Sequence, residues 1–429
     1  MRKSPGVPVL TPYRAIFTSP GTKGFSAAGL VARLPMGMFG IGIVTMLSEL
    51  RGSYALAGSV TAVALAAAAV LGPQISRLVD RHGQARVLVP AMLVCVAANT
   101  ALLLCARFDA PSWTLFATAA LSATAPNIGA MVRARWAHVF RDEPGRLHTA
   151  YSLEGALDEV CFVVGPILAV GLSTAWFPEA GPLLATVLLA VGSVLFAVQR
   201  STEPPVHPAR GRSGGSALRS PGLRILVVAF TATGVLFGAI EVTTVAFAEE
   251  LGSKAASSVV LAVHAFGSFL AGIAFGALPL KGTPAGRLVL GMTGMAACML
   301  PLLLAGNLVV LAVLLFVAGL STAPTLVSGM ALVERLVPAS KLTEGMTWAT
   351  TGLIVGVAAG SSVAGWVIDR ADAATAYGVP AAAGVLALAT ALLGWRWLHA
   401  EPEREGIDDG NGHGHTAGGK DRHLEQLGR

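Results

Sequence analysis

Long apolar runs separated by short polar segments dominate the chain. Twelve of them reach the roughly 18–20 residues that an α-helix needs to cross a bilayer. The runs are too long for barrel strands, and only helices and closed barrels satisfy their backbone hydrogen bonds in lipid. The pattern therefore predicts an all-α membrane protein. The twelve transmembrane helices are expected at roughly 25–47, 54–77, 87–107, 113–134, 149–174, 180–199, 223–248, 255–278, 286–305, 307–332, 343–367 and 374–398.

The apolar runs fall into two halves that resemble each other. Thr-Ala-Pro recurs at 124–126 and 322–324, in the fourth and tenth runs. Parallel repeats of this kind are typical of transporters built from two bundles around a central cavity. We expect two pseudo-symmetric six-helix bundles. The predicted domains are a cytoplasmic N-terminal segment (1–24), an N-terminal bundle (25–199), a flexible cytoplasmic linker (200–222), a C-terminal bundle (223–398) and a disordered cytoplasmic tail (399–429).

Composition agrees with a membrane protein. Hydrophobic residues make up 54% of the chain and charged residues only 13%, about half the charged fraction of a typical soluble domain. So little polar surface cannot cover a globule of this size in water. The net charge of +6 would suggest nucleic acid in a soluble protein. Here the basic residues lie in loops between apolar runs, so we expect a bilayer and no nucleic acid as partner.

The basic residues also predict the orientation. Loops on one side carry most of them, and cytoplasmic loops of membrane proteins are enriched in Lys and Arg. We expect both termini in the cytoplasm and the protein in the plasma (inner) membrane. The basic side holds Arg2, Lys3, Arg14, Lys23, Arg77, Arg81, Arg86, Arg133, Arg135, Arg141, Arg146, Arg200, Arg210, Arg212, Arg219 and Arg224, against Arg51, Arg107, Lys254 and Arg370 opposite.

The loop between the second and third runs, SRLVDRHGQARVL (76–88), resembles the signature loop of the major facilitator superfamily of secondary transporters. Leu78, Asp80, Arg81, Gly83 and Leu88 match its pattern, and Arg86 stands near a further basic position. The resemblance implies that Asp80 contacts a helix N-terminus and latches the two halves in the outward-open state. Such a contact is favourable because the dipole end is positive. The alternative is a basic loop that only sets topology.

The fifth run resembles the Gly-rich motif of the family's antiporters, which ends in G-P-x-x-G-G. Gly165 and Pro166 match the core of that motif, while Ala169 and Val170 replace its last glycines. Most replacements are small, so close packing between helices is retained. The resemblance implies a drug or metabolite efflux transporter.

Three carboxylates interrupt the fifth run. Glu154 and Asp158 share one helix face, and Glu159 points about 100° away from Asp158. A carboxylate at this depth costs roughly 2.5–3.5 kcal/mol on insertion scales, so it needs a cation, a proton or a cavity. Arg33, in the first run at similar depth, is the expected partner of Asp158 or Glu159. We expect one buried Arg33–acid pair and another acid that binds a proton.

Two alternatives to this role of the acids remain open. The ion pair could be structural, with Glu154 reaching the cytoplasmic surface among arginines, or the acids could touch substrate directly. Three other polar residues lie deep in the apolar runs: Glu241, His264 and Asn127. Glu241 and His264 could bind a cationic substrate or relay a proton, since His titrates near neutral pH. Asn127 could donate hydrogen bonds in the cavity, while His264 could also be a packing residue.

These features together predict secondary transport of a small molecule by alternating access. The leading hypothesis is proton-coupled efflux of a drug-like compound or metabolite. Proton symport or facilitated uptake is the alternative. A non-transporting membrane sensor or assembly factor is the alternative from another class. No phosphate-binding loop with Lys-Ser/Thr occurs, so we expect no ATP-driven step and no enzyme. We expect no cofactor, no metal and a monomer, with substrate and protons as partners.

Overall fold

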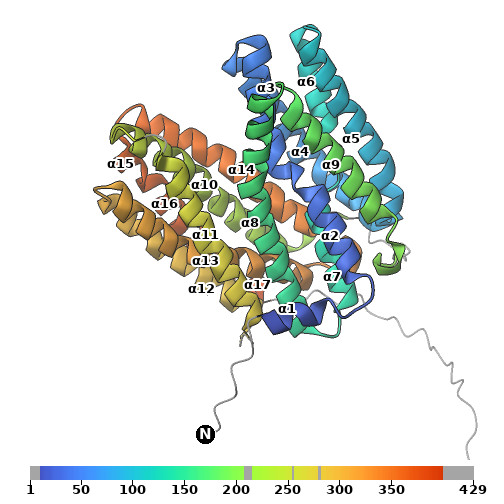
Figure 1. The fold of residues 1–429 in the computed structure, drawn as a ribbon. Coiled ribbons are helices and arrows are strands. Elements are labelled where there is room, and N and C mark those ends of the chain that lie inside the picture. The colour runs from blue at the N-terminus through green and yellow to red at the C-terminus, as the bar shows by residue number, and fades with distance from the viewer. Residues whose placement is uncertain (1–9, 207–214, 254–255, 279–281, 400–429) are drawn as a thin grey trace, which may run out of the picture.

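The structure is a computed structural model that describes residues 10–206, 215–253, 256–278 and 282–399. The described residues form helices joined by short loops (Figure 1). The helices before the linker are α1 (Leu10–Ile16), α2 (Thr22–Arg33), α3 (Pro35–Arg51), α4 (Tyr54–His82), α5 (Gln84–Arg107), α6 (Ser112–Ser122), α7 (Ile128–Val139), α8 (Pro144–Ala175) and α9 (Ala180–Ala197). Those after it are α10 (Pro221–Glu250), α11 (Ala256–Ala277), α12 (Pro284–Met299), α13 (Leu308–Leu336), α14 (Leu342–Ile368), α15 (Ala373–Ala376), α16 (Gly378–Leu393) and α17 (Trp395–Leu398).

Twelve spans result, six in each half. Eleven stretches of the described chain are long and apolar enough to cross a membrane, with α2 and α3 counted as one. The fourth span is divided into α6 and α7, each too short by itself. The prediction of one continuous helix over 113–134 is therefore wrong. Pro126 precedes the cap of α7, and proline disfavours helical geometry in the residue before it.

The first span, Thr22–Arg51, is one stretch, in agreement with the helix expected at 25–47. It is interrupted at Leu34, where α2 ends after Arg33 and α3 begins with Pro35, yet Leu34 keeps helical backbone angles. Proline fits the first turn of a helix because its missing N–H would have no partner there. This interruption and the break in the fourth span both lie in the N-terminal bundle, near the middle of their spans.

Small residues allow close helix packing within each bundle. Helices α10 and α14 make the most extensive contact, where a Cβ on Gly356 would lie 2.0 Å from the carbonyl oxygen of Thr231. In the N-terminal bundle the backbones of α8 and α3 touch, because a Cβ on Gly165 would lie 2.8 Å from the carbonyl carbon of Gly37. Gly165 and Pro166, which match the core of the Gly-rich motif, thus lie where α8 approaches α3.

The two bundles meet at one end and diverge at the other (Figure 1). Helices α4 and α14 run antiparallel, with Ser76 Oγ 2.8 Å from Thr347 Oγ1. Continuing this register outward would bring Gly58 beside Gly365. A Cβ on either glycine would meet nothing within 4 Å, so the helices have separated there. We call the contacting end, where α1 lies, the closed end, and the other the open end.

Further contacts at the closed end join α1 and α8 to α11. Tyr13 Oη donates to the carbonyl oxygen of Ile273 at 2.7 Å, and Thr149 Oγ1 donates to that of Gly276 at 2.8 Å. Burial raises the pKa of Tyr13 to about 12, so its phenol keeps the proton that it donates. The closed end is therefore held by hydrogen bonds from side chains to backbone as well as by packing.

The described ends of the segment predicted as a flexible linker are bound to the bundles. Glu203 Oε1 accepts a hydrogen bond from the backbone N–H of Ala85 at 3.0 Å. Ser216 Oγ donates to Glu344 Oε1 at 2.6 Å. The segment also contains two short 3₁₀ turns, Arg200–Thr202 and Ala217–Arg219. Of the tail predicted to be disordered, residues 400–429 lie outside the described residues.

Candidate functional site

Arg33 and two of the three acids of α8 meet inside the N-terminal bundle. Arg33 is the last residue of α2, and its Nη2 forms an ion pair with Glu154. Its Nη1 lies 2.7 Å from Asp158 Oδ1. Arg133 of α7 lies 2.6 Å from the other Asp158 oxygen, Oδ2. We call these four residues the arginine–acid cluster. Its formal charge is zero, with two guanidinium groups and two carboxylates.

Glu154 is the most enclosed member of the cluster. Its side chain is fully buried, and besides Arg33 it accepts hydrogen bonds from Ser26 Oγ at 3.2 Å and Trp136 Nε1 at 2.7 Å. The alternative in which Glu154 reaches the cytoplasmic surface is therefore wrong. Three side chains from α2 and α7 donate to the carboxylate.

The break between α6 and α7 places a helix N-terminus beside the cluster. Asn127 caps α7, since its Oδ1 accepts from the backbone N–H of Ala130 at 3.0 Å. The cap uses the Oδ1 acceptor of Asn127, and the expected role of its amide as a hydrogen-bond donor in the cavity stays a prediction. Gly129, in the first turn, lies against both arginines: a Cβ there would be 3.1 Å from Arg133 Nη1 and 3.5 Å from Arg33 Cδ.

Glu159 lies between the bundles rather than in the cluster. Its Oε1 accepts a hydrogen bond from Ser268 Oγ of α11 at 2.7 Å. Within the described ranges no Lys, Arg or His lies within ion-pair distance of Glu159. The expectation that Glu159 could be the partner of Arg33 is wrong, because Arg33 is occupied by Glu154 and Asp158. One turn toward the open end, Phe162 and Val163 are exposed, so Glu159 marks where α8 and α11 part.

Glu241 and His264 stay apart from the arginine–acid cluster. Glu241 is exposed and lies three residues after Gly238, on the α10 face that packs against α14. It forms no hydrogen bond or ion pair with another residue in the described part of the chain. His264 is half-buried, and its Nδ1 lies 2.9 Å from the carbonyl oxygen of Leu315. Because a carbonyl only accepts, Nδ1 carries the proton in this contact, which leaves Nε2 as the acceptor of the neutral ring.

The signature loop lies at the closed end. Asp80 accepts hydrogen bonds from the backbone N–H groups of Thr343 at 3.2 Å and Glu344 at 2.9 Å, in the first turn of α14. Arg77 Nη2 adds an ion pair with Glu344 at 2.9 Å. Gly83 has a φ of 92°, a backbone conformation that favours glycine. Arg81 and Arg86 are exposed.

Sequence reasoning missed several residues of these contacts. Arg77 and Glu344 form the cross-bundle ion pair of the signature loop, and Arg133 completes the arginine–acid cluster. The sequence indicates Arg77 only as a charge of the basic side, and Arg133 only as one of three arginines, with Arg135 and Arg146, that could accompany Glu154 at the surface. A usable signal for Arg133 was its position six residues after Asn127, on the half-helix that follows the proline break. The partner of Glu159, Ser268, carries no such signal because serine is common in membrane helices.

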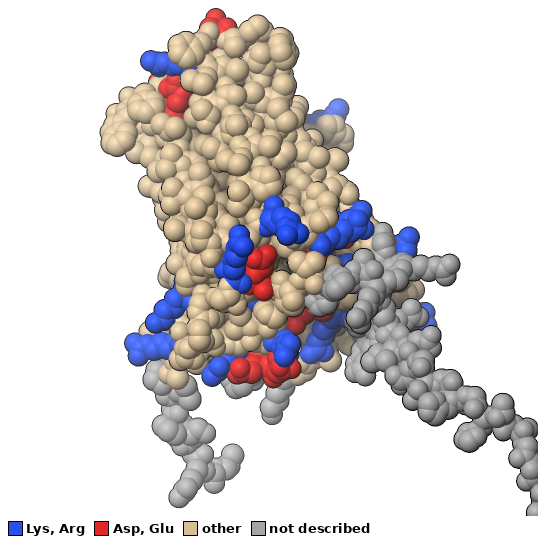
Figure 2. Space-filling view, turned by 90° about the vertical axis from the view of Figure 1, so that its right-hand side faces the viewer, with Lys and Arg blue, Asp and Glu red and all other residues tan. Residues whose placement is uncertain are grey.

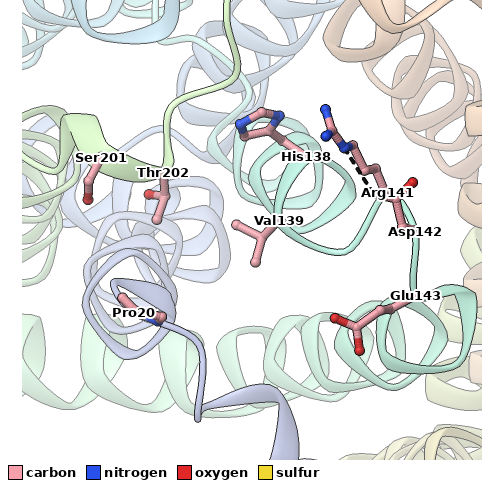
Figure 3. A pocket seen from close by; sticks show the side chains of 8 residues that line it. All are labelled: Pro20, His138, Val139, Arg141, Asp142, Glu143, Ser201 and Thr202. Carbon is pink, nitrogen blue, oxygen red and sulfur yellow. Dashed lines mark hydrogen bonds and ion pairs between the residues drawn. The ribbon is translucent and has the colours of Figure 1, made fainter.

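Two hollows lie outside the cluster. A polar one at the closed end, of about 410 Å³, is lined by the loop before α8 and by the start of the linker (Figure 3). Arg141 in it is paired with Asp142. An apolar groove between α11 and α13 is lined by residues that include Val259, Val309 and Phe316. Neither contains a residue of the cluster.

Comparison with known proteins identifies the family. The family model described as Major Facilitator Superfamily matches residues 25–309 and 226–417, so the chain belongs to this family of membrane transporters. No curated protein matches the sequence.

Solved structures with the same fold include three transporters. The human organic anion transporter MFSD10 has 14% identity and a TM-score of 0.68, over 87% of this chain and 100% of that one. A bacterial homologue of the iron transporter ferroportin in an outward-facing state has 15% identity and a TM-score of 0.70, over 88% and 99%. The E. coli fucose:proton symporter FucP has 13% identity and a TM-score of 0.67, over 86% and 98%. At these identities the likeness shows the fold alone.

Proposed function

We propose that this chain is a proton-coupled secondary transporter that moves a small molecule by alternating access. The observation that carries the proposal is Glu159, a carboxylate with no cation partner among the described residues, placed where the two bundles part. The other two acids of α8 are neutralised by Arg33 and Arg133. An unpaired carboxylate at membrane depth is costly unless it binds a proton or a ligand. Glu159 is therefore the proposed proton-binding residue.

Alternating access would change the surroundings of Glu159. In the present arrangement its hydrogen bond to Ser268 bridges the bundles. When the closed end opens, α8 and α11 must separate and this bond must break. The free energies of the protonated and ionised forms then shift by different amounts between the two states, which is the requirement for coupling a proton to a conformational change.

We further propose that the closed end faces the cytoplasm. Most of the basic side chains on the face drawn in Figure 2 lie in the half toward that end, among a few acidic ones, and fewer charged side chains lie at the opposite end. The enrichment of Lys and Arg in cytoplasmic loops supports this orientation. The termini would then lie in the cytoplasm and the protein in the plasma membrane, and the bundles would stand in an outward-facing arrangement.

The direction of transport follows from the sign of the coupling. Export by antiport, which the motif around Gly165 and Pro166 led us to expect, requires substrate and proton to exclude each other. Uptake by symport requires them to bind together. Proton release on substrate addition to the purified protein would indicate antiport, and proton uptake would indicate symport.

The test is proton-driven flux in proteoliposomes, with a panel of candidate compounds and a pH gradient. Glu159→Gln should abolish accumulation against a gradient while preserving substrate exchange at equilibrium, because the amide cannot bind the proton but can keep the Ser268 contact. Glu49→Gln, which removes an exposed acid near the open end of α3, is the matched control and should transport like wild type. Proton-driven accumulation that survives Glu159→Gln would contradict this role. No flux of any compound would favour the sensor class.

A further inference from the structure

We propose that the guanidinium of Arg133 is the binding site for a carboxylate or similar anionic group of the transported molecule, which takes the place of Asp158. The inference rests on the proposed transport function and assigns a chemical class to its substrate. Three features support this site: the hydrogen bonds of the cluster, the exposure of its members, and the helix N-terminus that the break between α6 and α7 places beside it.

The two arginines differ in how fully they are used. Arg33 donates to three acceptors: Nε to the carbonyl oxygen of Gly29 at 3.2 Å, Nη1 to Asp158 and Nη2 to Glu154. Among the described residues Arg133 donates only to Asp158, and its buried Nε has no hydrogen-bond partner there. A buried donor without a partner costs about 1–3 kcal/mol. Arg133 therefore has an unused donor available to a second carboxylate.

Exposure identifies the carboxylate that can leave. The Asp158 side chain is 21% exposed, against 0% for Glu154, 3% for Arg33 and 11% for Arg133. Asp158 is thus the member that solvent reaches, while Glu154 keeps Arg33 paired. Departure of Asp158 would leave Arg133 as the one guanidinium of the cluster without a counter-charge. A carboxylate matches its planar donors in a bidentate fashion.

The broken fourth span adds a second attraction for an anion. Helix α7, twelve residues long, begins beside the cluster, and its first-turn Gly129 leaves the backbone open to Arg133 Nη1. The N-terminus of a helix carries a partial positive charge. In transporters, half-helix N-termini at broken spans point at anionic groups of substrates. Two guanidinium groups therefore meet at Asp158, and a helix N-terminus lies beside both of them.

Charge balance links anion binding to a proton. The cluster is neutral, so an added anion leaves it with a net negative charge unless a proton binds as well. The proton proposed for Glu159, the next residue along α8, would supply that balance. The charged and titratable side chains that interact around Asp158 are Arg33 of α2, Arg133 of α7, Glu154, Glu159, Tyr151 and Cys161 of α8, and Glu334 of α13. Anion and proton would then bind together, which favours symport.

Chemical rescue tests the site without knowledge of the substrate. The full-length Asp158→Ala variant in detergent should unfold at a lower temperature than wild type, because Arg133 loses its counter-ion. Sodium acetate should raise that midpoint by about 3 °C or more over sodium chloride of equal ionic strength. Acetate should have no such effect on wild type or on Glu154→Ala, whose carboxylate position is sealed from solvent. The double variant Asp158→Ala/Arg133→Gln should lose the rescue.

The same acetate effect in all these proteins would overturn the proposal. If Asp158→Ala does not fold, the isosteric Asp158→Asn serves with the same comparison, since Arg133 loses its counter-charge there as well. Transport separates the two proposals. Proton-driven flux of cations or neutral compounds only, unchanged by Arg133→Lys, would overturn the anion site and leave proton-coupled transport standing. Rescue by acetate without any proton-driven flux would overturn proton-coupled transport and leave anion binding at Arg133 standing.

Discussion

At the scale of single residues, the pairing of the acids decides their roles. Glu154 and Asp158 lie one turn apart on α8, yet Glu154 is sealed among Arg33, Ser26 and Trp136 while Asp158 is partly exposed. Glu159, the next residue along the chain, faces the other bundle. Removing one partner of a buried ion pair leaves an uncompensated charge. The three acids should therefore differ in what their neutralisation costs.

We predict that Glu154→Gln destabilises the protein most, by about 3–5 kcal/mol, because Arg33 loses its buried counter-ion. Asp158→Asn should cost less, since Arg33 keeps Glu154 and the site is partly exposed. Glu159→Gln should cost least, because an amide oxygen can still accept from Ser268. Thermal unfolding of the three purified variants in detergent gives the order. A Glu159→Gln variant as unstable as Glu154→Gln would argue for a structural role of Glu159.

At the scale of helices, breaks and close contacts shape the site. The interruption at Leu34 ends α2 at Arg33, and the break at 123–127 lets α7 start five residues before Arg133. Gly165 allows α8 to approach α3 within backbone contact, which holds the acids of α8 near Arg33. Gly171, on the same helix, meets nothing within 4 Å of an added Cβ. The two glycines of α8 thus form a matched pair for mutation.

Gly165→Ala should destabilise the protein by about 1–3 kcal/mol, because its methyl group would overlap the backbone of Gly37 and push α8 from α3. Gly171→Ala should be neutral or stabilising, by up to about 1 kcal/mol, since alanine favours helix over glycine. Both effects can be read from thermal unfolding in detergent. Equal midpoints for the two variants would mean that α8 and α3 are not in backbone contact at Gly165.

At the scale of the whole molecule, the closed end is one connected set of contacts between bundles. Asp80 accepts from the first-turn N–H groups of α14, Arg77 pairs with Glu344, and Glu344 also accepts from Ser216 of the linker. The charge of Asp80 at the positive end of α14 should favour the present state over one with the closed end open. The described end of the linker is therefore bound to the same carboxylate as Arg77.

Asp80→Asn should shift the balance toward the state in which the closed end opens. The lost charge–dipole contact is worth about 1 kcal/mol, or roughly a fivefold change in the ratio of the two states. Spin labels on cysteines at Gly58 and Gly365, on the open-end parts of α4 and α14, should report more short distances in the variant. Arg86→Gln, an exposed change in the same loop, is the control. An unchanged distance distribution for Asp80→Asn would exclude a latch at this position.

The sequence by itself determined the class of fold, the positions of the spans, the basic side and the family. It also indicated that Arg33 and the α8 acids lie at similar depth, because helical rise converts position into depth. The contact of Asp80 with a helix N-terminus could be expected because the loop resembles the family's signature pattern. These properties follow from hydropathy, from helix geometry or from a local motif.

Only the tertiary structure decided which side chains meet. Periodicity gives the face of a helix but not its rotation against neighbouring helices. The sequence therefore did not show that Arg33 pairs with both Glu154 and Asp158, or that Glu159 accepts a hydrogen bond from Ser268. It did not place Arg133 in the cluster either, because that requires the break before α7. Contacts between distant segments depend on how two bundles dock, and small residues with no local signal set that docking.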